Sequence, residues 1–398
     1  MPTVSLRRFL GAALASFVVL ASVGACDEAR PADGSVEAPA CTANTDCTDS
    51  ALPFCALEGE CVEPPAGGLI GWGDGSAASV TFTVVFEPDK PRASTDLAFH
   101  PSRDELWVLN YQDDSVFIVS KPGASDASWV RKHDPDAMHF MHKPPALAFG
   151  DANFADDFTF GVCGDDDGNG GDHFMGPALF SSSPTIFAKS TPGGLGSHLD
   201  MLHSTSFCRG IAHETANVYW TFNAELGSLD KYDFHVDHGP GEDDHSDGEI
   251  WRYARGQVAG VDGVVSHMFF SPDDQSLYVA DTGNARIVKL DTTTGTVGKS
   301  FAGDEPAKRR VVDGAVLTEI VPAGTLDQPS GLELHDGVLY VSDSAQSRFY
   351  AFTLDGTSLR TLDTGLPPGS LAGLTVGPDG RIYFVDRLTS RVLRIDSF

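Results

Sequence analysis

Residues 267–291 read HMFFSPDDQSLYVADTGNARIVKLD, and this stretch decides the fold. Three short segments at 267–271, 277–281 and 286–291 are separated by a Pro-Asp turn and a Gly-Asn turn. Apolar residues that alternate with polar ones predict β-strands, and Gly, Asn, Asp and Pro are the residues that turns require. The stretch therefore predicts three consecutive strands joined by tight turns.

The same pattern recurs along most of the chain. Further copies lie at 96–119, 146–164, 210–234, 331–356 and 373–396, of which the copy at 146–164 is the weakest. The pattern closely resembles the NHL repeat, and this resemblance implies an all-β fold, a six-bladed β-propeller. A single blade would leave both faces in water, whereas radial packing of blades covers them. Seven blades are the alternative if residues 68–93 contain a degenerate copy.

The ring needs a strand from outside the last repeat. The chain ends soon after the third strand of the sixth copy, and SVTFTVVFEPD at 79–89 reads as a strand. We expect residues 79–89 to supply the outer strand of the last blade and so to join the two ends of the ring.

The N-terminal segment carries an export signal. Arg7 and Arg8 precede an apolar run from Phe9 to Val23, which is too short to span a bilayer comfortably. The exit Val-Gly-Ala-Cys resembles a bacterial lipobox and implies lipidation of Cys26; ordinary signal cleavage is the alternative. The predicted organisation is a signal peptide at 1–25, a flexible tether at 26–40, a Cys-rich module at 41–65 and the propeller at 66–398.

The cysteines agree with export. Seven Cys is an odd number, but removing Cys26 to the lipid leaves six that can pair in an oxidising compartment. Four of them lie in a module that is too small to fold without covalent cross-links, so two disulfides are expected there. A zinc knuckle is the alternative interpretation. We expect a third bond to join neighbouring blades. In chain order the six are Cys41, Cys47, Cys55, Cys61, Cys163 and Cys208.

The charge narrows the classes of partner. The chain has 56 acidic and 27 basic residues, a formal net charge of −29. Such a surface repels phosphate backbones, which argues against nucleic-acid binding, and it attracts divalent cations or cationic ligands. A simpler interpretation is that the charge keeps an exported protein soluble.

Histidines concentrate in one part of the chain. Eleven of 13 lie between His133 and His267. Loops from blades 2 and 3 should share one rim of a propeller, where neutral imidazoles can converge on Zn²⁺ or another transition metal. Surface or structural histidines are the alternative. The candidate ligands are His139, His142, His173 and His203.

Two acidic loops are candidate metal sites, and the first is a candidate calcium site. The first, DDDGNG at 165–170, matches the first half of a calcium loop but has no Glu at its twelfth position. The second, at 237–249, is rich in carboxylates, and a solvated loop is the alternative there. The candidate metal ligands in the two loops are Asp165, Asp167, Asn169, Asp237, Asp243 and Asp247.

Arg209 stands just before an inner strand and could reach the central channel to bind a ligand carboxylate. A salt bridge with a neighbouring acidic residue is the alternative.

The resemblance to NHL propellers also raises an enzymatic hypothesis. This group includes the peptidyl-hydroxyglycine amidating lyases, which hold zinc through histidines at the starts of inner strands. None of the corresponding residues here is His: they are Thr95, Pro145, Arg209, Ser266, Ser330 and Ala372.

Two functions follow as hypotheses. The first is a lipid-anchored protein of the bacterial cell envelope, on the extracytoplasmic side. Its propeller would bind a small molecule, peptide or protein and would have loops stabilised by divalent metal. The alternative is a metal-dependent hydrolase or lyase with a His-lined site at the rim.

Overall fold

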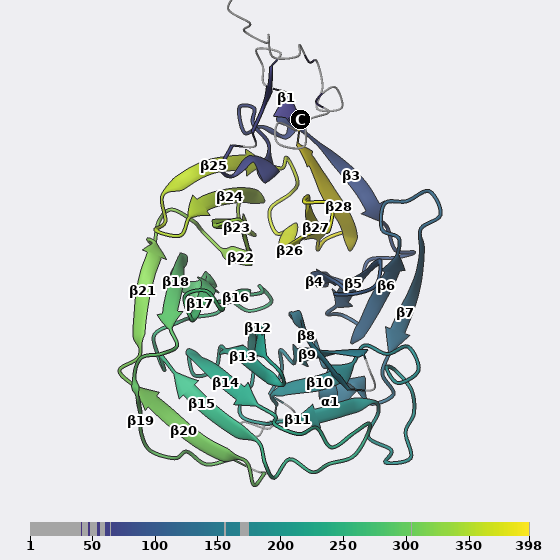
Figure 1. Cartoon of the computed structure of the whole chain (residues 1–398), viewed down its shortest axis with the longest axis vertical. Coiled ribbons are helices and arrows are strands. Elements are labelled where there is room, and N and C mark those ends of the chain that lie inside the picture. Colours follow the sequence, from purple (N-terminus) through teal and green to yellow (C-terminus); the bar gives the residue numbers. More distant parts are fainter. Residues whose placement is uncertain are drawn as a thin grey trace, which may run out of the picture.

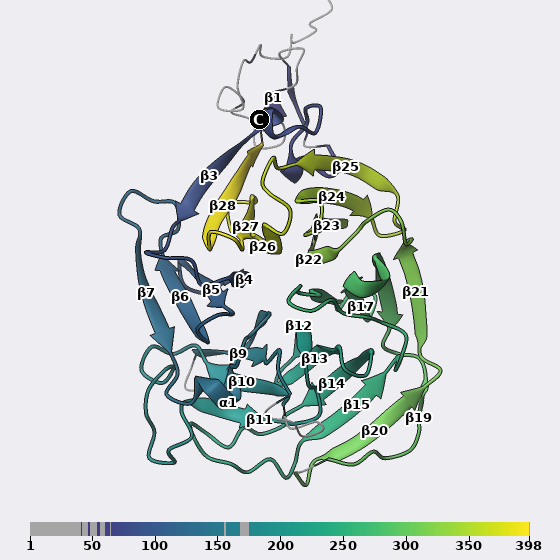
Figure 2. The same ribbon diagram turned by 180° about the vertical axis from the view of Figure 1, so that it is seen from behind.

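Six β-sheets stand radially around one axis and form a closed ring (Figure 1 and Figure 2). The computed structural model describes Cys41, Cys47 and residues 54–55, 60–63, 65–154, 157–167, 175–303 and 305–397. The predicted signal peptide and tether lie outside these residues, as does Cys26. Over the described part of the chain, the fold is the predicted all-β six-bladed propeller, and residues 68–93 form no seventh blade.

Each blade begins with an inner strand that faces the axis. The six inner strands are β4 (Ser94–Phe99), β8 (Leu147–Phe154), β12 (Cys208–Thr215), β16 (Met268–Ser271), β22 (Pro329–His335) and β26 (Leu371–Val376). The second strands are β5 (Glu105–Asn110), β9 (Asp157–Cys163), β13 (Val218–Asn223), β17 (Ser276–Asp281), β23 (Val338–Asp343) and β27 (Ile382–Asp386). Neighbouring inner strands contact one another all the way around the ring.

The outer half of each blade completes the sheet. The third strands are β6 (Ser115–Ser120), β10 (Pro177–Ser181), β14 (Ser228–Asp233), β18 (Arg286–Asp291), β24 (Arg348–Thr353) and β28 (Arg391–Ser397). The outer strands are β7 (Ser128–His133), β11 (His198–Met201), β15 (Glu249–Tyr253), β21 (Val316–Val321), β25 (Ser358–Asp363) and β3 (Val80–Phe86). Pairing within every blade is antiparallel.

The two ends of the ring meet in the sixth blade. β3 pairs with β28 in the register Val392↔Phe86 to Ser397↔Val80, which confirms the predicted closure. Because β3 comes from the N-terminal side and β28 from the C-terminal side, backbone hydrogen bonds hold the ring shut (Figure 1).

The side chains of the second strands do not alternate between a buried and an exposed face. Every residue of β13, β17 and β23 is buried, because each blade is covered on both faces by its neighbours. The outer strand β7, in contrast, is exposed along most of its length. Aromatic side chains fill the space between blades: Trp107 of blade 1 lies 5.1 Å from Phe160 of blade 2, centroid to centroid.

An insertion in blade 4 adds strands to the sheet of blade 3. The connection from β18 to β21 contains β19 (Thr296–Val297) and β20 (Lys308–Asp313). β20 pairs in parallel with β15 of blade 3, so the insertion of blade 4 extends the sheet of blade 3.

In the part of the chain that the structure describes, helical segments are few and short. They are the helix α1 (Ala137–Phe140), between blades 1 and 2, and the 3-10 turns η2 (Gly68–Ile70), η3 (Ala77–Ser79) and η4 (Thr282–Asn284). Among the described residues, no helix has the length and hydropathy of a membrane span.

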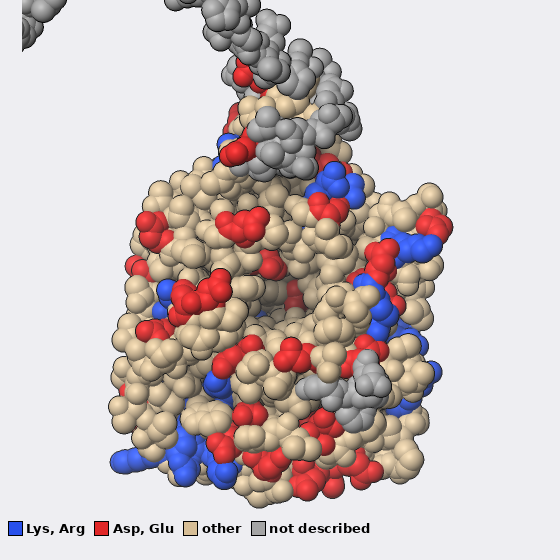
Figure 3. Space-filling view, viewed as in Figure 1, with Lys and Arg blue, Asp and Glu red and all other residues tan. Residues whose placement is uncertain are grey.

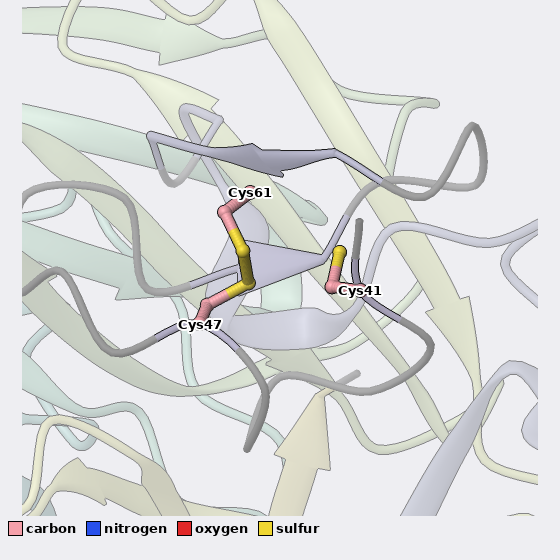
Figure 4. A group of neighbouring side chains, drawn as sticks. All are labelled: Cys41, Cys47 and Cys61. Carbon is pink, nitrogen blue, oxygen red and sulfur yellow. A yellow bond between two sulfur atoms is a disulfide. The ribbon is translucent and has the colours of Figure 1, made fainter. Parts of the chain in front are cut away.

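A small disulfide-bonded sheet precedes the ring. β1 (Phe54–Cys55) pairs with β2 (Cys61–Val62). A disulfide joins Cys47 to Cys61, and Figure 4 shows Cys41 beside it. Cys41 is also disulfide-bonded, so these sulfurs are not free thiolates for a zinc knuckle, and the predicted disulfide module is supported.

Candidate functional site

The inner strands of all six blades surround a central cavity of about 320 Å³. Figure 3 shows a hollow at the centre of the ring, with acidic side chains around its mouth and inside it. Because side chains alternate along a strand, the first and third residues of each repeat face the axis. The cavity is therefore lined by the repeats themselves.

Two polar side chains meet across this cavity. Asp96 of β4 and His267, next to β16, occupy the same repeat position in blades 1 and 4, which lie on opposite sides of the ring (Figure 1). His267 Nε2 lies 3.3 Å from Asp96 Oδ1. The carboxylate also accepts hydrogen bonds from the backbone N–H groups of Leu97 at 2.7 Å and Leu147 at 2.8 Å.

Glycines make room for this pair. Gly210 and Gly373 stand at the same repeat position in blades 3 and 6. A Cβ on Gly373 would lie 2.4 Å from Asp96 Oδ1, and a Cβ on Gly210 would lie 2.1 Å from the carbonyl oxygen of Ser266. Only residues without a side chain allow the backbones to approach the axis this closely.

A second carboxyl group lies in the cavity wall. Glu333 is the third residue of the fifth repeat and has a hydrogen bond with Thr375 of the neighbouring blade. The half-buried ring of Phe269, the third residue of the fourth repeat, belongs to the same wall, as does Phe149, whose ring packs on Trp107 of blade 1. Among the described residues that line the cavity, none is Lys or Arg.

Burial changes the ionisation of these groups. It raises the pKa of Glu333 to about 8 and the pKa of Asp96 well above its usual range. It also lowers the pKa of His267 to about 4. Charged forms are disfavoured in an apolar enclosure, so Glu333 is mostly protonated and His267 uncharged at neutral pH. Strongly shifted groups in a concave site mark a candidate functional site.

Arg209 has partners within the chain. Its guanidinium is buried and contacts the carboxylates of Asp165 and, at 3.0 Å, Asp262. Tyr111 donates a hydrogen bond to Asp165 at 2.8 Å. Arg209 is not among the residues that line the cavity, and the salt bridge offered as the alternative is the contact that the structure contains.

The first acidic loop is only partly described. Asp165 is held by Arg209 and Tyr111, and Asp167 is half-buried. Asn169 and His173 lie outside the described residues, so calcium in this loop stays a prediction. In the second loop, Asp243 and Asp247 are exposed, and Asp237 Oδ1 accepts a hydrogen bond from Gly239 N at 3.2 Å.

The predicted sharing of a rim by several loops is supported. Backbone hydrogen bonds join Asp165 to Lys143 and Ser204 to Met175, so the connections before and after blade 2 both lie beside its β9–β10 loop. A disulfide joins Cys163 to Cys208 between blades 2 and 3, as the sequence predicted.

The predicted histidine ligands do not all meet. The rings of His139 and His203 lie 6.0 Å apart, and His203 Nδ1 is 2.7 Å from Glu305. His142 instead lies 3.5 Å from Asp166, to which Lys143 also binds.

A larger group, here called the histidine cluster, extends from this pair between blades 2 and 3. Successive ring centroids lie 6.3 Å apart for His203 and His245, 5.1 Å for His245 and His238, and 4.9 Å for His238 and His198. Asp200 of β11 lies among them and binds His245 Nδ1 at 2.9 Å. Burial lowers the pKa of His198 to about 3 and raises that of Asp200 to about 6.

Sequence reasoning missed the groups that the structure brings together. Asp96 and Glu333 carried a signal, since each is an acidic residue beside Leu in an inner strand, and His267 directly precedes the inner strand β16. Asp200, His238 and His245 lie within the tracts singled out for histidine and acid content, but spacing alone could not show that they meet.

The similarity of this chain to known proteins is a similarity of fold. No protein-family model and no curated protein matches this sequence. Among solved structures, an auxiliary nutrient binding protein from Bacteroides thetaiotaomicron has a TM-score of 0.52 and 11% identity, over 77% of this chain and 69% of that one. A Bacteroides thetaiotaomicron protein of unknown function has a TM-score of 0.51 and 10% identity, over 80% and 76%. A luciferin-regenerating enzyme has a TM-score of 0.50 and 10% identity, over 80% and 97%. A binding protein and an enzyme thus share this architecture, so the propeller alone does not fix an activity.

Proposed function

We propose that this protein is a ligand-binding propeller of the bacterial cell envelope that captures a small organic cation with an apolar body in its central cavity. The observation that carries the proposal is the composition of the wall. It offers two carboxyl groups, Asp96 and Glu333, beside aromatic rings, and none of its described residues is Lys or Arg.

The chemistry of the wall favours a cation over an anion. A bound ammonium group would stabilise the ionised form of Glu333, and an aromatic face attracts a cation by about 0.5–2 kcal/mol. An anion would meet carboxyl groups without any compensating positive charge. Acidic side chains around the mouth (Figure 3) would also raise the local concentration of cations.

The disulfides and the N-terminal sequence support the proposed location in the cell envelope. Disulfides such as Cys163–Cys208 indicate an oxidising compartment outside the cytoplasm. The lipobox-like sequence at Cys26 supports a lipid anchor to the membrane, with the tether holding the propeller away from the surface. The name of the Bacteroides nutrient binding protein is in keeping with a capture role for this architecture.

A matched set of three ligands tests the proposal. Calorimetric titration would compare phenethylammonium, the neutral phenethyl alcohol and the anion 3-phenylpropionate, which share an aromatic body and differ in charge. We expect the cation to bind at least about tenfold more tightly than the neutral compound, a difference of about 1.4 kcal/mol. The anion should show no binding in the same range.

Variants then locate the site. Glu333→Gln should weaken cation binding about tenfold and leave the neutral compound unaffected. Asp336→Asn is the matched control, because its side chain lies in the same blade but is 91% exposed. Equal binding of all three ligands, or equal loss in both variants, would contradict a cation site in the central cavity.

A further inference from the structure

We propose that Asp200, His238 and His245 form a binding site for a divalent transition-metal ion of the zinc type, which clamps blade 3 to blade 2. The site lies apart from the central cavity, at the outer edge of the ring. Asp200 belongs to β11, the outer strand of blade 2, and both histidines belong to the connection between β14 and β15 of blade 3.

The three side chains are already gathered. One donor atom from each lies within 4.8 Å of the other two. Asp200 is 1% exposed, and His238 and His245 are half-buried. Little rearrangement would bring three such atoms to the distances of about 2.0–2.2 Å at which zinc holds nitrogen and oxygen ligands.

The hydrogen bonds of this group leave two buried acceptor atoms without a donor, one on His238 and one on Asp200. His238 Nδ1 lies 2.7 Å from the carbonyl oxygen of Gly239, a contact in which the imidazole must be the donor. This bond fixes the tautomer and leaves a lone pair on Nε2. Within the described structure, His238 Nε2 and Asp200 Oδ2 are both buried and accept no hydrogen bond.

A third imidazole, that of His198, has the same kind of hydrogen bond. His198 is fully buried and stacked on Phe140, and its Nδ1 lies 2.8 Å from the carbonyl oxygen of Leu195. Its Nε2 is therefore another buried lone pair with no donor among the described residues. Buried polar atoms without partners cost about 1–3 kcal/mol each. A positive ion would satisfy His238 Nε2 and Asp200 Oδ2, which receive no hydrogen bond from the described residues.

The donor types select the kind of ion. Imidazole nitrogen suits zinc, copper, nickel and related ions, whereas calcium and magnesium prefer sets made of oxygen. Two imidazoles and one carboxylate thus favour zinc over calcium. The hydrogen bonds of His238 and His198 to backbone carbonyls are the supporting contacts that ligating histidines usually have.

The expected role of the ion is structural. The loop that carries both histidines already lies along β11, because His238 N bonds to Leu199 O at 3.1 Å and Gly241 N to His198 O at 2.9 Å. An ion held by Asp200 on one side and by the histidines on the other would fasten this loop. It would join the same two blades as the Cys163–Cys208 disulfide.

Metal analysis of the whole exported chain tests the proposal. Protein stripped with a chelator and dialysed would be titrated with Zn²⁺ alone and, separately, with Co²⁺, whose visible absorption reports coordination by nitrogen and oxygen. We expect one tightly bound equivalent per chain, and a rise in the melting temperature on loading, since an ion that binds only the folded state stabilises it.

Variants identify the ligands. Asp200→Asn and His238→Gln should each weaken zinc binding on the order of 100-fold, while His235→Ala, an exposed histidine of the same connection, should bind as the parent does. Circular dichroism would verify that each variant is folded, and His245→Gln supplies an independent ligand change if one variant fails to fold. No tight equivalent in the parent protein, or the same affinity in folded ligand variants, would overturn the proposal.

Discussion

Asp96 and His267 show how a repeat can vary one residue to build a site. Four blades have Gly or Ala at the first repeat position, whereas blades 1 and 4 have Asp and His, which meet across the axis at 3.3 Å. Glycine in the neighbouring blades leaves the space that these side chains occupy. The substitution of single residues in an otherwise apolar position thus converts a packed centre into a polar cavity.

Glu333 should make stability depend on pH. Its carboxyl group ionises near pH 4.5 in an unfolded chain, while burial raises its pKa to about 8 in the folded protein. Between these values the unfolded chain loses the proton and the folded chain keeps it, so stability falls as the pH rises. The loss should amount to about 2–3 kcal/mol between pH 6 and pH 9.

Urea unfolding of Glu333→Gln at both pH values measures this effect. The variant cannot ionise, so its stability should decline less than that of the parent by the amount given above. Asp336→Asn, which changes an exposed group, should follow the parent curve. Parallel curves for the parent and Glu333→Gln would show that the carboxyl group is not protonated in the folded protein.

At the scale of elements, the connections around blade 2 hold the features that distinguish this propeller from a plain ring. The connections before and after this blade both bond to its β9–β10 loop, and the β14–β15 connection of blade 3 lies against β11. The insertion of blade 4 adds β20 to the edge of blade 3. Long connections therefore bind blades 2, 3 and 4 to one another at their edges, in addition to the packing of their faces.

The Cys163–Cys208 disulfide should stabilise this part of the ring against unfolding. It closes a loop with a sequence separation of 45 residues, and the loss of chain entropy in the unfolded state predicts about 4 kcal/mol. Replacing both cysteines with serine should lower the free energy of unfolding by about that amount. Guanidinium unfolding at fixed metal content provides the measurement.

The N-terminal module offers the control for this disulfide. Replacing Cys47 and Cys61, which are joined outside the ring, should leave the main unfolding transition of the propeller unchanged. If the Cys163/Cys208 variant unfolds at the same denaturant concentration as the parent, the bond does not hold the blades together.

For the whole molecule, closure depends on one strand from the far end of the sequence. β3 pairs with β28 and also reaches the next blade, since Phe86 packs against Phe117 with ring centroids 5.0 Å apart. The strand thus completes blade 6 and fixes it against blade 1. Without this strand, blade 6 would lose its outer strand, and the apolar surface that Phe86 covers would be exposed to water.

Phe86→Ala should destabilise the ring more than Val84→Ala does. Phe86 is 4% exposed, and loss of a buried Phe costs about 3–5 kcal/mol. Val84→Ala on the same strand is the matched control, because Val84 is 46% exposed and should cost under about 1 kcal/mol. Urea unfolding of both variants gives the comparison, and equal midpoints would show that β3 contributes little to closure.

Much of this architecture follows from local sequence. Segments such as LYVAD and RIVKLD, with their Pro-Asp and Gly-Asn turns, predict strands and their order, and the strand at 79–89 was needed to complete the last blade. These features depend on backbone geometry over a few residues and on the burial of alternating side chains. Pairing of Cys163 with Cys208 followed once neighbouring blades were assigned.

The tertiary structure alone decided which side chains meet. Asp96 reaches His267 only because six blades place the first and fourth on opposite sides of a narrow axis. Asp200 joins His238 and His245 because a loop of one blade lies along the outer strand of another. Such distances depend on blade number and on the path of long connections, and neither periodicity nor residue spacing along the chain contains that information.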